Sequence, residues 1–70
     1  MPITMAKPGE TVTIARITGT DAVRQHLSEM GFVVGEQVMV ISNIAGQMIL
    51  QVKDARIAID TKMANRVMIR

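Results

Sequence analysis

The amino-acid sequence predicts a mainly β domain, a small and partly open five-stranded barrel with one short α-helix between its first and second strands. Short stretches in which apolar and polar residues alternate recur along the chain, as in strands with one buried face. Turn sequences separate these stretches, and a single segment has the spacing of an amphipathic helix. Closing the strands on themselves would remove edges that 70 residues can hardly cover otherwise.

The first two predicted strands each follow the same kind of tight turn. Lys7-Pro8-Gly9-Glu10 has the sequence of a type II turn, in which proline presets φ and the following glycine supplies a positive φ. The alternating segment Thr11–Ile17 comes next and reads as a strand. Val33-Val34-Gly35-Glu36 repeats the pattern before a second strand, Gln37–Ile41. We therefore expect one turn design to be used twice.

A helix is predicted between these strands, from Asp21 to Met30, with Thr20 or Asp21 as its cap. Gly31 follows at once and suits the left-handed position after a helix end. One apolar stripe runs along the helix, formed by Val23, Leu27 and Met30. A helix this short is marginal alone in water, so we expect it to dock onto the barrel.

The second half of the chain reads as strands again. Gln47–Val52 and Arg56–Ile59 flank Lys53-Asp54-Ala55, a tight hairpin turn in which Asp54 tolerates a left-handed conformation better than most residues. A turn or single helical turn and a last strand are then expected at Thr61–Asn65 and Arg66–Arg70. With no linker or low-complexity tract, residues 1–70 are expected to form a single domain.

The amino-acid composition indicates the cellular compartment in which the protein is expected. The sequence has no cysteine, which excludes a disulfide framework, a thiolate metal site and a thiol nucleophile. A secreted domain of this size would usually need disulfides, so a reducing, cytoplasmic compartment is expected. No apolar run has the length of a signal peptide or of a bilayer span, so the chain is not expected to be embedded in a membrane.

Nucleic-acid binding is the alternative function, and the sequence does not favour it. The net charge is +2, and basic residues are spread along the chain instead of being clustered. A phosphate-binding stripe would form only if folding collects Arg16, Lys53, Arg56 and Arg66. Binders of single strands stack bases on aromatic side chains, and the single aromatic here, Phe32, is expected in the core.

The order of these motifs resembles the FeoA family. The resemblance begins at the turn Lys7–Glu10 and is most specific over Ala22–Gly35, which is similar to the family pattern Arg-x-x-Leu-x-x-Leu/Met-Gly-Leu-x-Pro-Gly. It continues through Ile57-Ala58-Ile59 and Ala64–Ile69, and so covers nearly the whole chain.

The chain departs from the family pattern at two positions. Val34 stands where proline is typical, and Asp54 stands where glycine is common. The turn can accept Val34.

The resemblance implies an SH3-like barrel and a non-catalytic cytoplasmic accessory protein of ferrous-iron uptake, without a cofactor. It also implies the partner, a membrane ferrous-iron transporter with a cytosolic GTP-binding domain, which the accessory modulates. Similar domains occur at the C-terminus of metal-dependent repressors. Because no helix-turn-helix precedes the barrel here, a stand-alone accessory is expected.

We expect the partner to bind the segment from the helix to the following turn. Arg24 would be its charged anchor, and Val33 with Val34 its exposed apolar contact. The full set of expected partner-binding residues is Arg24, Met30, Gly31, Phe32, Val33, Val34 and Gly35.

The seven methionines suit either a core or an adaptable surface. Either Met39 or the pair Val38 and Val40 faces outward, and an outward Met39 could form an apolar patch with Ile41 and Met68. Either a strand edge or this patch would suit a homodimer.

Neither a metal site nor catalysis is expected. His26, the sole histidine, has Glu29 one helical turn away, and this pair is a weak candidate because stable sites use three or four ligands. Ser28 is expected on the exposed helix face and Ser42 in a loop, with one histidine for both. No phosphate-binding Gly-Lys-Thr/Ser segment is present.

Overall fold

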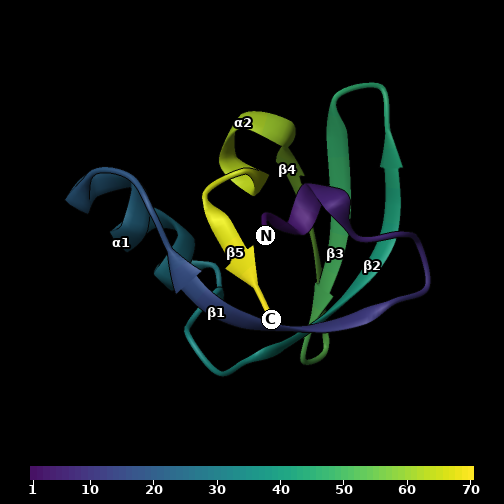
Figure 1. The fold of residues 1–70 in the computed structure, drawn as a ribbon, viewed down its shortest axis with the longest axis horizontal. Helices are drawn as coiled ribbons and strands as arrows, with labels where there is room; N and C mark the ends of the chain where they lie inside the picture. The colour runs from purple at the N-terminus through teal and green to yellow at the C-terminus, as the bar shows by residue number, and fades with distance from the viewer.

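The computed structural model describes residues 1–70 and contains five strands in one antiparallel sheet (Figure 1). In chain order the elements are η1 (Ile3–Met5), β1 (Thr11–Ile17), α1 (Asp21–Glu29), β2 (Gln37–Ile44), β3 (Gln47–Val52), β4 (Ala55–Asp60), α2 (Thr61–Ala64) and β5 (Val67–Ile69). The sheet order is β4-β3-β2-β1-β5, so β4 and β5 are the two edge strands and do not pair with each other. The mainly β fold with a helix between β1 and β2 is thus confirmed.

Both tight turns form as predicted. Gly9 and Gly35 have φ values of 91° and 90°, in the left-handed region that glycine adopts without a steric penalty. The amide of Glu10 donates to the carbonyl of Lys7 at 3.1 Å, and the equivalent bond of the second turn, from Glu36, is also 3.1 Å long. The same turn design therefore precedes both β1 and β2.

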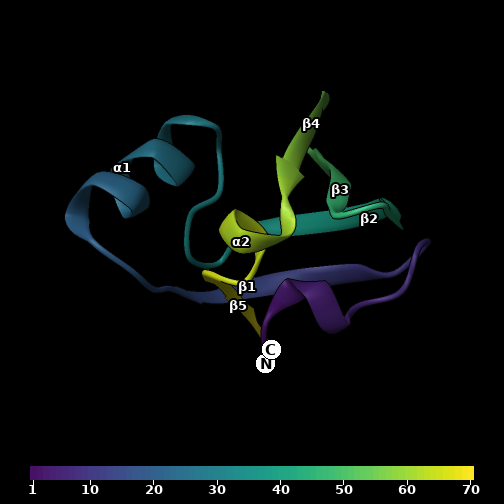
Figure 2. The same cartoon turned by 90° about the horizontal axis from the view of Figure 1, so that it is seen from above.

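Helix α1 forms where the apolar stripe predicted it, and ends one residue earlier. The side-chain oxygen of Thr20 accepts a hydrogen bond from the Val23 amide and caps the N-terminus. At the other end Gly31 has a φ of 104°, and this reversal lets the Phe32 amide donate to the carbonyl of Leu27. Figure 2 shows that α1 lies to one side of the sheet, next to the end of β1.

The core is entirely apolar. Its buried residues are Ile3, Ala6, Ile14, Leu27, Phe32, Val38, Val40, Met48, Leu50, Val52, Ile59, Ala64, Val67 and Ile69. Leu27 joins this core, and Val23 and Met30 pack partly buried against it, so the predicted stripe is confirmed. Val38 and Val40 point inward, and Met39 is 39% exposed, which settles which of them faces outward. Ile41 and Met68 are half-buried.

Two predictions about the hairpins are wrong. Strand β2 does not end at Ile41 but continues to Ile44, so Ser42 lies in a strand opposite Ile49 and not in a loop. An irregularity between Val40 and Ser42 interrupts the alternation of inward and outward side chains, which concealed the continuation in the sequence.

The second correction concerns the turn between β3 and β4. The left-handed residue there is Lys53, with a φ of 55°, and not Asp54. Because Val52 lies directly opposite Ala55, the turn has two central residues, and Lys53 takes the first position, where a positive φ is required.

The sequence pattern predicts no helix or strand in the segment before the turn that leads into β1. Ile3–Met5 forms a 3-10 helix, and Ile3 is fully buried in the core. Neither of the two α-helices is long and apolar enough to cross a membrane.

Candidate functional site: a pocket beside the helix

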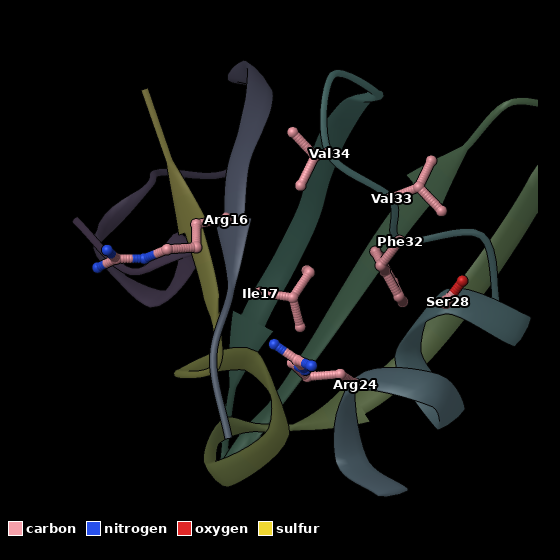
Figure 3. Close-up of a pocket in the computed structure, with 7 residues that line it drawn as sticks. All are labelled: Arg16, Ile17, Arg24, Ser28, Phe32, Val33 and Val34. Atoms are coloured by element: carbon pink, nitrogen blue, oxygen red, sulfur yellow. The ribbon is translucent and has the colours of Figure 1, made fainter. Parts of the chain in front are cut away.

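A pocket of about 410 Å³ lies between α1, the end of β1 and the segment that leads from α1 to β2 (Figure 3). Its lining residues are Arg16, Ile17, Arg24, Ser28, Phe32, Val33 and Val34. Ile17, Phe32 and the two valines supply apolar surface, whereas the arginines and Ser28 are polar. The pocket is thus an apolar hollow with a polar border, which suits an apolar side chain of a partner.

Phe32 anchors the segment that forms one wall of this pocket. Its side chain is fully buried, whereas Val33 and Val34, which follow it, are 40% and 60% exposed. Figure 3 shows the Phe32 ring directed between β1 and α1, with both valines on the segment above it. Phe32 therefore supports the pocket from below and offers a partner very little surface, while the valines are accessible.

The two valines lie in a turn that is hydrogen-bonded to β1. They occupy its first two positions, and the Gly35 amide that follows donates to the carbonyl of Ile14 at 2.8 Å. In return the Ile14 amide donates to the carbonyl of Glu36 at 3.0 Å. Because Ile14 is fully buried in β1, the apolar contact of the candidate site is fixed to the core of the barrel.

Arg24, the expected charged anchor, has an exposed side chain on α1. Its guanidinium lies 2.9 Å from a carboxylate oxygen of Asp21, one helical turn away, and the two side chains are 54% and 96% exposed. An exposed pair of this kind contributes less than about 1 kcal/mol, so Arg24 can exchange Asp21 for a partner's carboxylate at small cost. In Figure 3 the Arg24 guanidinium is directed towards Ile17.

The structure brings four of the seven expected partner-binding residues to the pocket, namely Arg24, Phe32, Val33 and Val34. Met30 is half-buried against the core, and Gly31 and Gly35 supply the positive φ angles at the two ends of the valine segment. These three shape the site and do not line it.

Three lining residues were missed by sequence reasoning: Arg16, Ile17 and Ser28. The alternation in β1 marked Ile17 as apolar, but no local signal says that α1 folds back beside the end of β1. Arg16 contributes to the lining through its stem, since Figure 3 shows its guanidinium directed away from the valines.

Metal ligands do not converge on this site. His26 and Glu29 are both exposed on α1. No group of three or more histidine, aspartate and glutamate side chains comes together in the structure. The histidine and the glutamate alone offer fewer ligands than the three or four that a stable protein site uses.

The four basic residues that could have formed a stripe lie on non-adjacent strands of the sheet or at their ends. Arg16 lies on β1 opposite Met68 of β5, and Arg66 directly precedes β5. Lys53 and Arg56 lie at the hairpin between β3 and β4, which β2 separates from β1 in the sheet order.

Sequence comparison identifies the protein family to which the chain is similar. A model of the FeoA domain matches residues 1–70. A Methanocaldococcus jannaschii protein named Fe(2+) transport protein A is 34% identical to this chain over 68 residues. The alignment covers 97% of this chain and 83% of that protein.

Solved structures extend the comparison. The crystal structure of an iron uptake regulatory protein, FeoA, superposes with a TM-score of 0.91 at 33% identity, over 100% of this chain and 93% of that one. Stenotrophomonas maltophilia FeoA in complex with zinc, described as an SH3 domain protein, has a TM-score of 0.86 at 25% identity, over 100% and 89% of the two chains. The expected SH3-like barrel is confirmed.

The fold also occurs as part of longer proteins. A manganese-dependent transcriptional repressor superposes with a TM-score of 0.87 over 96% of this chain, which corresponds to 39% of the repressor chain. At 17% identity this likeness concerns the fold alone.

Proposed function

Since this chain belongs to the FeoA family, we propose that it is a non-catalytic accessory protein of ferrous-iron uptake that binds a membrane ferrous-iron transporter. The partner surface is the cytosolic part of that transporter, which carries a GTP-binding domain, and binding modulates transport. The protein acts in the cytoplasm and needs no cofactor of its own.

The observation that carries this proposal is the pair of exposed valines beside the pocket. Val33 and Val34 are two of only six large hydrophobic side chains that are exposed, and they adjoin apolar lining from Ile17. Exposed apolar surface with a polar border is typical of sites that bind other proteins. A partner segment with an apolar side chain for the pocket and a carboxylate for Arg24 would match the site in both shape and charge.

Binding of single-stranded nucleic acid is disfavoured by the burial of Phe32. This side chain is fully buried and is the one aromatic residue in the chain, so no aromatic surface is available for stacking on a base.

An affinity pull-down from detergent-solubilised membranes of the native host tests the proposal. The bait is the wild-type chain, beside the double variant Val33→Ser/Val34→Ser. Recovery of the GTP-binding ferrous-iron transporter by the wild type, and its loss with the variant, would support both the function and the face.

The matched control is Ile44→Ser, which removes an exposed apolar side chain, 72% accessible, at the other end of β2. Recovery of the transporter should be unchanged with this control. Equal recovery with the valine variant would contradict the proposed face, and recovery of nucleic acid in place of the transporter would contradict the function.

A further inference from the structure

Strand β4 presents an open hydrogen-bonding edge. It is the last strand of the sheet on that side, and the ladder with β3 is regular over all six of its residues (Figure 1). A short edge strand, a proline or a bulge normally protects such an edge from pairing with another chain. Strand β4 has neither a proline nor a bulge, and charged residues are its single protective device.

The register with β3 fixes which groups of β4 face outward. Val52 lies opposite Ala55 on either side of a two-residue turn, and such a flanking pair exchanges main-chain hydrogen bonds. Alternate residues therefore bond to β3, and the residues between them direct N–H and C=O groups to the free edge. The outward-facing residues are Arg56, Ala58 and Asp60. The main-chain groups of Arg56 and Ala58 bond to no loop or cap. Asp60 is also the N-cap residue of α2, so its carbonyl faces the first turn of that helix.

The side chains of the same three residues are exposed, and two of them, Arg56 and Asp60, carry opposite charges. Arg56 and Asp60 are not part of any ion pair within the chain. Arg56 makes one hydrogen bond, of 3.3 Å, to Gln51. One carboxylate oxygen of Asp60 accepts from the Met63 amide at the start of α2, which leaves the second oxygen free. Between them stands Ala58, whose small side chain permits close approach.

From this edge we infer that β4 pairs antiparallel with β4 of a second copy of this chain, about a two-fold axis at Ala58. Outward-facing residues pair with outward-facing residues, so Ala58 meets Ala58 of the second copy and exchanges both main-chain hydrogen bonds with it. Arg56 then lies opposite Asp60 of the second copy on the same face, twice by symmetry.

Charge selects this register over its neighbours. Centring the axis on Arg56 would place two guanidinium groups opposite each other, and centring it on Asp60 would place two carboxylates together. Like charges directly opposite one another destabilise a strand pair, and opposite charges stabilise it. In the central register, half-buried Ile57 lies beside Ile59 of the second copy on the inner face. More of the apolar surface of Ile57 is then buried from water.

Sedimentation equilibrium of the purified chain over a range of concentrations, at low salt, tests this inference independently of any transporter. The expected result is a reversible monomer–dimer equilibrium. Arg56→Glu should weaken it by about tenfold or more, because two attractive pairs become repulsive. Arg70→Glu changes the net charge equally, outside β4, and should leave the dimer much less affected. A chain that stays monomeric up to millimolar concentration would overturn the inference.

A second pair of variants tests the main-chain contact itself. Ala58→Pro removes an N–H group that no bond within the sheet uses, so the monomer should fold while the dimer is lost. Ala58→Thr keeps the amide and should still form the dimer. Circular dichroism verifies the fold of each variant. A dimer that survives both Ala58→Pro and Arg56→Glu would place the interface elsewhere and overturn the inference.

Amide hydrogen exchange identifies the edge directly, in the wild-type chain. The amides of Arg56, Ala58 and Asp60 should exchange quickly in dilute solution and become protected as the concentration rises. If protection rises elsewhere and not at these three amides, β4 is not the interface. Protection of the same amides only on addition of a transporter fragment would assign the edge to that partner and exclude the second copy.

Discussion

Gly35 and Ile14 are joined by a main-chain hydrogen bond of 2.8 Å, and Gly9 and Val40 are joined by an equivalent bond of 2.7 Å. In both cases the glycine of a tight turn donates its amide to a buried residue on the neighbouring strand. Because β1 and β2 pair antiparallel, the two turns are related by a local two-fold symmetry. The turn that presents the valine contact is therefore built into the framework of the barrel.

This symmetry predicts that Gly9→Ala and Gly35→Ala cost similar amounts of stability. Nothing lies within 4 Å of a Cβ added at either glycine, so the cost comes from the positive φ alone. We expect about 1–2 kcal/mol for each in urea denaturation. Asparagine tolerates this region better, so Gly35→Asn should cost less than Gly35→Ala. A cost near zero for both alanine variants would refute the turn geometry.

Leu27 attaches α1 to the core. It is fully buried, and truncation to alanine should lower the free energy of unfolding by about 2–5 kcal/mol. In a domain of this size that loss can unfold the protein. Gln25→Ala, at an exposed position of the same helix, is the control and should change stability little. A loss below about 1 kcal/mol for Leu27→Ala would contradict the docking of the helix.

Thr20 caps the same helix through its side-chain oxygen, which lies 3.3 Å from the Val23 amide. Thr20→Ala removes this acceptor and should cost about 1 kcal/mol in the same denaturation assay. Thr20→Ser retains the acceptor and serves as the control, with a cost of at most a few tenths. Equal stability of the two variants would show that the cap contributes nothing.

A substitution in the hairpin turn between β2 and β3 should increase the stability of the protein. Ala45 and Gly46 have φ values of 54° and 79°, the combination of a type I′ turn, in which alanine is strained at the first position. Ala45→Asn should raise the free energy of unfolding by roughly 0.5–1 kcal/mol, because asparagine accepts this conformation more readily. Ala55→Asn, in a strand, should not stabilise. A destabilised Ala45→Asn would contradict the turn assignment.

Much of this architecture is readable from the sequence because local signals agree with the fold. Gly9 and Gly35 mark turns that only a positive φ permits, and the stripe that contains Leu27 ends at Gly31, where the helix stops. These signals require no knowledge of distant contacts.

The parts that escape sequence reasoning depend on contacts far apart in the chain. Ile3 carries no periodic pattern, and it is buried because the barrel closes over it. Ser42 and Ala45 belong to a hairpin whose bulge and turn residue are atypical. In the pocket, Val33 and Val34 could be expected as exposed because they form the first half of a turn, whereas Ile17 joins them only through the path of α1 back to β1.

The affinity of the chain for the purified cytosolic part of the ferrous-iron transporter, measured by isothermal titration calorimetry, tests the central claim most directly. Val33→Ser/Val34→Ser should weaken binding by about tenfold or more, since burying two valine side chains contributes roughly 1.5–3 kcal/mol each when complete. Its melting temperature should stay near that of the wild type, as should the affinity of Ile44→Ser. Unchanged affinity of the valine variant, or loss of binding through unfolding, would contradict the account.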